Sequence, residues 1–295
     1  MTSFLQLLFQ GLALGCVYAL VALGFTVVYR ASQVINFAQG SLLLVGAYLV
    51  SVFATGLNVP FLVAVIVAIA LLAAGCMLFQ FVVLQRVLGQ PVFVLVMITI
   101  GLSIAINSAI PAIFGPDSRI LGDPWGASAA HVGGVTLNWV RIWTIGCTAL
   151  ILGGYFVFDR FSRYGLAMRA TAADQEAALA VGVPIRRVYA LTWAIAGAVA
   201  TVGGLFLSGF PSSVNPTLGD VSLRAFPAII LGGLDSPPGA VVGGIAIGII
   251  EVLTSAYAPS WAGSNFSDVA PYILMIIVLM VRPYGLFGTR PVERI

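Results

Sequence analysis

The sequence predicts an all-α fold, a polytopic bundle of about 8–10 membrane-spanning helices that contains an inverted-topology repeat. Hydrophobic residues make up 60% of the chain and charged residues only 8%, with a mean hydropathy of +1.09. A soluble domain carries roughly a quarter charged residues, so this chain lacks the polar surface to cover one. Several apolar windows of about 20 residues contain no charge, and they are continuous rather than alternating, which favours helices over a barrel.

The expected spans follow one another along the chain, separated by short polar or Pro/Gly-containing turns. They lie at about residues 7–29, 42–55, 61–84, 92–114, 142–158, 188–210, 225–234, 240–257 and 269–281. The run 225–234 is too short to cross a bilayer comfortably, so we expect a broken or tilted span there.

Basic residues set the expected orientation, because cytoplasmic loops are enriched in arginine and lysine. A hydrophilic segment at 159–187, the basic island, holds five of the chain's 13 basic residues: Arg160, Arg163, Arg169, Arg186 and Arg187. We expect this island to be cytoplasmic, together with the other basic residues near span ends, namely Arg30, Arg86, Arg282, Arg290 and Arg294. About nine crossings result, with the N-terminus outside, the C-terminus inside, and residues 115–140, 210–220 and 258–268 outside.

Two interruptions share the pattern aliphatic-Asn-x-x-x-Gly, one ending at Gly40 and the other at Gly219. Five expected crossings separate them, so they start from opposite membrane faces, as an inverted repeat requires. Two unrelated Asn-containing turns are the alternative. The repeat divides a single transmembrane domain, residues 1–295, into a first half (1–158), a cytoplasmic loop (159–187) and a second half (188–295).

These interruptions are the candidate translocation path. Non-helical backbone at membrane depth persists only where protein or water satisfies its polar groups. The side chains there are uncharged donors and acceptors, which suit a neutral or zwitterionic solute; helix capping is the alternative role. Glu251 lies inside a span and either faces the path or clamps two helices. The candidate path residues are Asn36, Gln39, Ser41, Asn215, Thr217 and Glu251.

Small residues recur at four-residue spacing in two spans, at Gly11 and Gly15 and again at Gly244 and Gly248. This spacing predicts close helix packing. No pattern predicts catalysis or a cofactor. His131 stands alone, the three cysteines have no metal-ligand spacing, and there is no nucleotide-binding motif or basic tract for nucleic acid. We therefore predict no catalytic residue, no metal and no cofactor.

The basic island contains a short predicted helix. Asp174 and Glu176 favour its start and Gly182 its end, with small alanines between. Glu176-Ala-Ala-x-x-x-Gly182 resembles the EAA loop of ABC-importer permeases, a cytoplasmic helix that docks on the ATPase. Tyr18-Ala-Leu-Val-Ala-Leu-Gly24, Ile35-Asn-Phe-Ala-Gln-Gly40 and Arg282-Pro-Tyr-Gly-Leu-Phe-Gly288 are similar to the branched-chain amino-acid ABC permease family, specifically its H-type subunit. Members often carry an acid after the glycine at 40, whereas this chain has Ser41.

The resemblance implies a multi-pass permease subunit in the bacterial cytoplasmic membrane, moving branched-chain or related amino acids without hydrolysing ATP itself. It implies a second permease subunit as a heterodimer partner, two cytoplasmic ATPases and an extracytoplasmic solute-binding protein, within a lipid bilayer. The coupling residues would be Arg169, Asp174, Glu176, Ala177, Ala178 and Gly182. The alternatives are import of urea, amides or another small polar solute by the same architecture, a self-sufficient carrier or channel, and a membrane enzyme. Neither a carrier nor a channel needs an ATPase-docking helix.

Overall fold

The structure is a computed structural model that describes residues 2–87, 89–126, 128–132, 135–209, 212–258, 263 and 266–288. Its elements, in chain order, are α1 (Thr2–Ser32), α2 (Gln39–Ser51), η1 (Val52–Gly56), α3 (Phe61–Val82), η2 (Leu84–Val87), α4 (Val92–Phe114), β1 (Ala129–Val132), β2 (Val135–Asn138), α5 (Trp139–Phe161), α6 (Arg163–Ala173), α7 (Gln175–Ala180), α8 (Ile185–Leu207), η3 (Pro216–Asp220), α9 (Val221–Gly232), α10 (Pro237–Tyr257) and α11 (Phe266–Val281).

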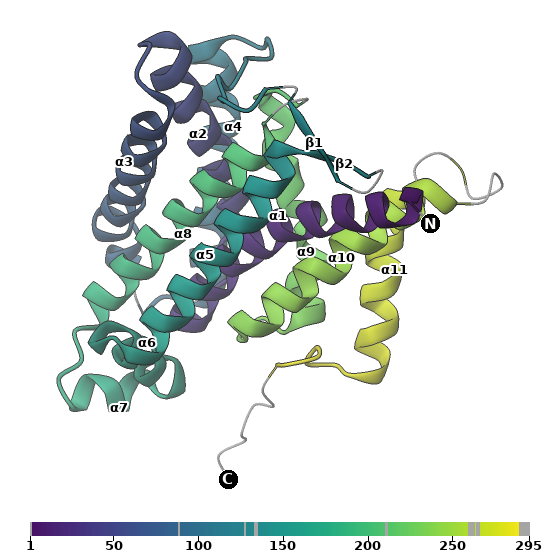
Figure 1. Cartoon of the computed structure of the whole chain (residues 1–295). Coiled ribbons are helices and arrows are strands. Elements are labelled where there is room, and N and C mark those ends of the chain that lie inside the picture. Colours follow the sequence, from purple (N-terminus) through teal and green to yellow (C-terminus); the bar gives the residue numbers. More distant parts are fainter. Residues whose placement is uncertain are drawn as a thin grey trace.

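The fold class predicted from composition is confirmed. Within the described ranges, seven helices are long and apolar enough to cross a membrane, and α11 is a shorter apolar helix. The expected outer segment 115–140 also contains a small antiparallel hairpin, β1–β2, which the sequence did not indicate. In Figure 1 this hairpin lies at the end of the bundle opposite to α6 and α7.

The helix α1 lies at the centre of the bundle and runs antiparallel to α8. Gly203 of α8 approaches Leu20 and Val21, whereas Tyr189, one turn into α8, packs with Ala31 near the end of α1. The contacts of α1–α4 recur in α8–α11 when α1, α2, α3 and α4 are matched in order with α8, α9, α10 and α11. The contact of α1 with α10 then corresponds to that of α8 with α3, and the contact of α2 with α8 to that of α9 with α1. Within each unit, α2 packs on α3 and α4, and α9 packs on α10 and α11. An antiparallel pair of units with matching contacts is the arrangement that an inverted repeat produces.

The glycines of α1 and α10 let these two helices approach closely. A Cβ atom at Gly248 would lie 2.2 Å from the backbone nitrogen of Gly15, and one at Gly244 would lie 2.4 Å from that of Ala19. No side chain larger than hydrogen fits at either position without movement of backbone. The predicted packing role of these small residues is therefore confirmed.

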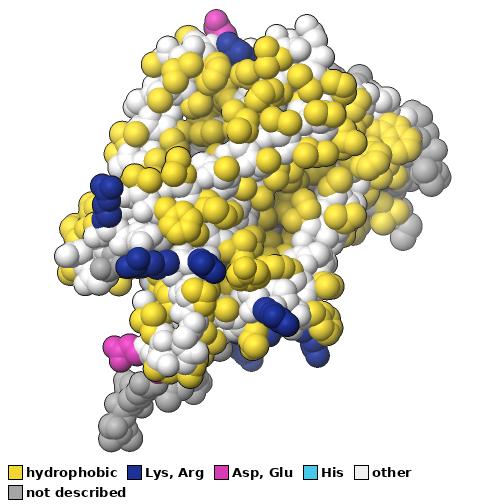
Figure 2. Space-filling view, turned by 90° about the vertical axis from the view of Figure 1, so that its left-hand side faces the viewer, with side chains coloured by type: hydrophobic (Ala, Val, Ile, Leu, Met, Phe, Trp, Pro, Cys, Tyr) yellow, Lys and Arg dark blue, Asp and Glu magenta, His cyan; other side chains and the backbone are white. Residues whose placement is uncertain are grey.

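Charged groups gather at one end of the bundle, which carries α6 and α7. Arg30 of α1 reaches Asp159 of α5 at this end, beside the turn between α9 and α10. Figure 2 shows a broad hydrophobic surface above, with basic side chains along its lower part. Such a surface suits lipid or another membrane subunit rather than water. Arg290 and Arg294, expected at the same end, lie outside the described residues.

Several expected span boundaries differ from the structure by a few residues. The seventh apolar run was placed at residues 225–234, but α9 begins at Val221 and ends at Gly232. The helix starts early because Asn215 caps the turn η3, which leads directly into α9. The fifth span is also longer than expected, from Trp139 to Phe161, because the polar ends of this helix continue beyond its apolar middle.

Candidate translocation pathway and coupling helix

The two interruptions meet inside the bundle. A Cβ atom at Gly40 would lie 2.2 Å from the carbonyl oxygen of Gly219 and 2.3 Å from Oγ of Ser222. The first interruption enters from the end that carries α7, and the second enters from the opposite end, where Val214 pairs with Arg119. We call the contact of Gly40 with Gly219 and Ser222 the crossing point. Both α2 and α9 begin near it, so it brings together the two segments that the sequence placed at opposite faces.

Two amide side chains fill the first interruption and hold each other in place. Asn36 Nδ2 donates to Gln39 Oε1 at 3.3 Å, and Asn36 Oδ1 accepts from the backbone N–H of Ala38 at 3.1 Å. Gln39 Nε2 donates to the carbonyl of Ala196 in α8 at 3.2 Å. Asn36 and Gln39 are both 0% exposed. The hydrogen bonds compensate the burial of the two amides. Because neither side chain is exposed, the bundle is closed at this level.

Ser41 joins the crossing point to α4. Its Oγ lies 2.8 Å from Oγ of Ser103 and donates to Asn107 Oδ1 at 3.1 Å. The sequence reasoning missed Ser103 and Asn107. The signal was present: together with Thr99 they recur every fourth residue in a largely apolar span, which places them on one helix face.

Asn215 and Thr217 contact each other rather than the crossing point. Asn215 Oδ1 accepts from the backbone N–H of Thr217 at 3.1 Å and from its hydroxyl at 2.8 Å. Asn215 thus has the capping contacts that were left open as an alternative.

A cavity of about 350 Å³ lies between the crossing point and the end that carries α7. Its polar lining is dominated by carboxamides, and the described lining residues include no charged side chain. The amides are Gln33, Asn36, Gln80, Gln90 and Gln175. The volume is at the lower end of the range for small-molecule sites, and carboxamides can donate and accept hydrogen bonds to a neutral or zwitterionic solute.

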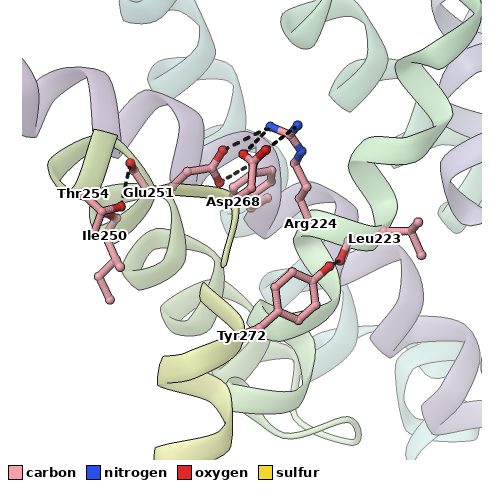
Figure 3. Close-up of polar contacts among 8 residues, drawn as sticks. Leu223, Arg224, Ile250, Glu251, Thr254, Asp268 and Tyr272 are labelled. Carbon is pink, nitrogen blue, oxygen red and sulfur yellow. Dashed lines mark hydrogen bonds and ion pairs between the residues drawn. The ribbon is translucent and has the colours of Figure 1, made fainter. Parts of the chain in front are cut away.

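A charged group lies on the other side of the crossing point (Figure 3). Arg224 of α9 reaches Glu251 of α10 at 3.6 Å and Asp268 of α11 at 3.2 Å. Tyr18 of α1 donates its hydroxyl to the second oxygen of Glu251 at 2.6 Å. Tyr272 donates to the carbonyl of Leu223 at 2.9 Å, which ties α11 to α9. We call Arg224, Glu251 and Asp268 the charged triad.

Sequence reasoning identified Glu251 but missed Arg224 and Asp268. Asp268 was assigned to the polar segment 258–268, and Arg224 was left between the interruption 210–220 and the short apolar run 225–234. Arg224 itself was the available signal. Basic residues are enriched in cytoplasmic loops, so an arginine near an interrupted span on the expected outer side is not explained by membrane orientation and indicates another role.

Asp159 joins three helices at the opposite end. Its carboxylate lies 3.3 Å from Nη1 of Arg30 on α1 and 3.4 Å from Nη1 of Arg169 on α6. Arg169, one of the candidate coupling residues, is therefore an ion-pair partner of α5 and lies one helix before α7.

The remaining coupling candidates form α7 and its boundaries. Asp174 caps the helix, accepting the backbone N–H groups of Glu176 and Ala177 at 3.0 Å each. Ala178 is buried against the bundle, whereas the side of α7 that carries Glu176 and Ala177 is exposed. Gly182 follows with φ = 84°, a left-handed conformation that ends the helix. The predicted helix start and end are both confirmed.

The chain matches, over residues 7–279, the protein family described as branched-chain amino acid transport system / permease component. It is 33% identical to the high-affinity branched-chain amino acid transport system permease protein LivH of Salmonella typhimurium, over 99% of this chain and 98% of that protein. LivH of Escherichia coli K12 is 33% identical, and the corresponding protein BraD of Pseudomonas aeruginosa 30%, each over 99% of this chain and 98% of the relative. The motif resemblance is confirmed, and the chain belongs to the family of permease components of branched-chain amino acid transport systems.

Proposed function

We propose that this protein is the membrane-spanning permease subunit of an ATP-driven importer of branched-chain or related amino acids in a bacterial cytoplasmic membrane. Its partners are a second, related permease, two cytoplasmic ATPases and an extracytoplasmic solute-binding protein. Family membership and the relatives' names support the substrate class. ATP is hydrolysed on the ATPases, and the permease supplies the path.

The observation that carries the proposal is the position of α7. This helix is capped, one side of it is exposed, and its first residue, Gln175, lines the amide cavity. A force applied to α7 therefore reaches the cavity wall directly. A carrier that works alone has no use for such a helix.

Charge reversal on α7 tests the coupling. Glu176→Arg places a cation on the exposed side, and we expect it to abolish leucine uptake by intact cells and to reduce co-purification of the ATPases. Asp117→Arg, an equivalent reversal at the opposite end of the bundle, is the matched control and retains the ATPases. Normal uptake by Glu176→Arg at wild-type membrane levels would refute the assignment.

Import of urea or a short amide is the second candidate. The amide-lined cavity favours it, because carboxamides bond to urea as readily as to an amino acid. Competition separates the two: excess urea leaves leucine uptake unchanged if amino acids are the substrate, and inhibits it if urea uses the same path.

A further inference from the structure

The charged triad lies within the apolar helices α9, α10 and α11, toward the end of the bundle opposite to α7. Glu251 is 14 residues beyond Pro237, the first residue of α10, which corresponds to about 21 Å of helix from the end that carries α7. Its partner Tyr18 is near the middle of α1. The triad therefore belongs to the half of the bundle remote from the amide cavity.

Two members of the triad are open to their surroundings. The side chains of Arg224 and Asp268 are 48% and 43% exposed, whereas that of Glu251 is only 11% exposed. A charged group facing hydrocarbon costs several kcal/mol, so ionisable residues within spans face water or another polar group. The exposed side of the triad therefore requires water or a polar partner.

The three charges are arranged unequally. Glu251 is fixed by the Tyr18 hydroxyl on one oxygen and by Arg224 near the other. Asp268 is held by Arg224, at 3.2 Å and 3.4 Å from its two terminal nitrogens. Glu251 is thus the buried acid of the triad, 3.6 Å from Arg224, and the Arg224–Asp268 pair is its exposed part.

We propose that the charged triad binds the zwitterionic head group of an α-amino acid on its way to the crossing point. The substrate carboxylate binds to the exposed guanidinium of Arg224, which can donate two parallel hydrogen bonds to a carboxylate. The substrate ammonium takes the carboxylate of Asp268 that Arg224 releases. One internal ion pair is replaced by two ion pairs to the substrate, so no charge is left unpaired. The side chain of the amino acid plays no part in these contacts, so the site accepts the class rather than one member.

This inference rests on the proposed function, because it assumes that an amino acid is the substrate. Its test is independent of ATP and of uptake. Leu223, next to Arg224, is 58% exposed and its side chain can be replaced by a thiol. The Leu223→Cys chain is inserted in proteoliposomes, alone and with its partner subunits, and treated with a membrane-impermeant cationic thiol reagent. The wild-type chain, treated in the same way, is the control for labelling of the native cysteines.

We expect Leu223→Cys to be labelled, and L-leucine to protect it. Leucine at about ten times its Kd slows labelling roughly tenfold, because the rate falls as one plus the ratio of ligand to Kd. The amine 3-methylbutylamine and the acid 4-methylpentanoate each lack one charge of the head group and do not protect. Arg224→Met and Asp268→Asn, each combined with Leu223→Cys, abolish protection by leucine. A melting temperature equal to that of Leu223→Cys alone shows that each double variant is folded. Leu150→Cys on α5, which is 76% exposed but distant from the triad, is the control for a lipid-facing thiol and stays unlabelled.

Three outcomes of the labelling experiment overturn the proposal. Absence of labelling shows that the triad faces lipid, and labelling that disappears only in the assembled complex shows that it is an interface with the second permease. Equal protection by leucine and by either single-charge analogue excludes recognition of the zwitterion. If protection is found but uptake is not driven by ATP, the binding site stands and the proposed function fails; ATP-driven uptake without protection gives the reverse result.

Discussion

Replacing Gly248 by alanine tests the packing that places Tyr18 against Glu251. The new Cβ atom would lie 2.2 Å from the nitrogen and 2.3 Å from the Cα of Gly15. Carbon atoms pack at about 3.5–4.0 Å, so α10 must move away from α1 by roughly 1 Å or more. Overpacking costs about 1–3 kcal/mol, and the upper end applies because backbone rather than a flexible side chain is in the way. At about 2–4 °C per kcal/mol, the melting temperature should fall by roughly 6–12 °C.

The assay is the fraction of detergent-solubilised chain that remains monodisperse on gel filtration after heating. Gly101→Ala in α4 is the matched control, because nothing lies within 4 Å of a Cβ atom there. Alanine is favoured over glycine in a helix by about 1 kcal/mol, so the control should melt at the wild-type temperature or above it. A Gly248→Ala chain as stable as the control would show that α1 and α10 are not in the contact described.

Three further predictions concern the interruption, the coupling helix and the orientation. Gln39→Leu leaves the buried Asn36 amide without its acceptor, which should cost about 1–3 kcal/mol and lower the melting temperature; Asn36→Ala in the same chain should add less than its separate effect, and full additivity would contradict the contact. Asp174→Ala removes the cap of α7, worth about 1 kcal/mol, so more ATP should be hydrolysed per leucine imported, without loss of folded protein; unchanged stoichiometry would show that the cap is not needed for coupling. A cysteine in place of Arg163 should react with an impermeant thiol reagent only from the cytoplasmic face, and reaction from outside would invert the orientation.

Features that depend on neighbouring residues could be predicted from the sequence. The length and apolar character of α3 and α4 follow from uninterrupted hydrophobic runs. Asp174 caps α7 and Gly182 ends it because both effects act within one turn of helix. The close approach of α1 and α10 was indicated by glycines at four-residue spacing, although the partner of each glycine was not.

The polar contacts in the interior could not be predicted, because they join segments far apart in the chain. Tyr18 and Glu251 are 233 residues apart, and no local pattern specifies their distance. Arg224 was left between the interruption 210–220 and the apolar run 225–234, because no local pattern shows that an interrupted helix carries a charge whose counterion comes from neighbouring helices. The meeting of Gly40 with Gly219 was likewise hidden, since the repeat predicts opposite origins but not the depth at which the segments meet.

Leucine accumulation in proteoliposomes is the most direct measurement of the central claim. The chain is reconstituted with its second permease and binding protein, with or without the ATPases. The uptake of radiolabelled leucine is then measured while the leucine concentration inside the vesicles exceeds that outside. We expect accumulation only when the ATPases and ATP are present, and none when Glu176 is replaced by arginine. Equal accumulation by the membrane subunits alone would contradict it and identify the protein as a self-sufficient carrier.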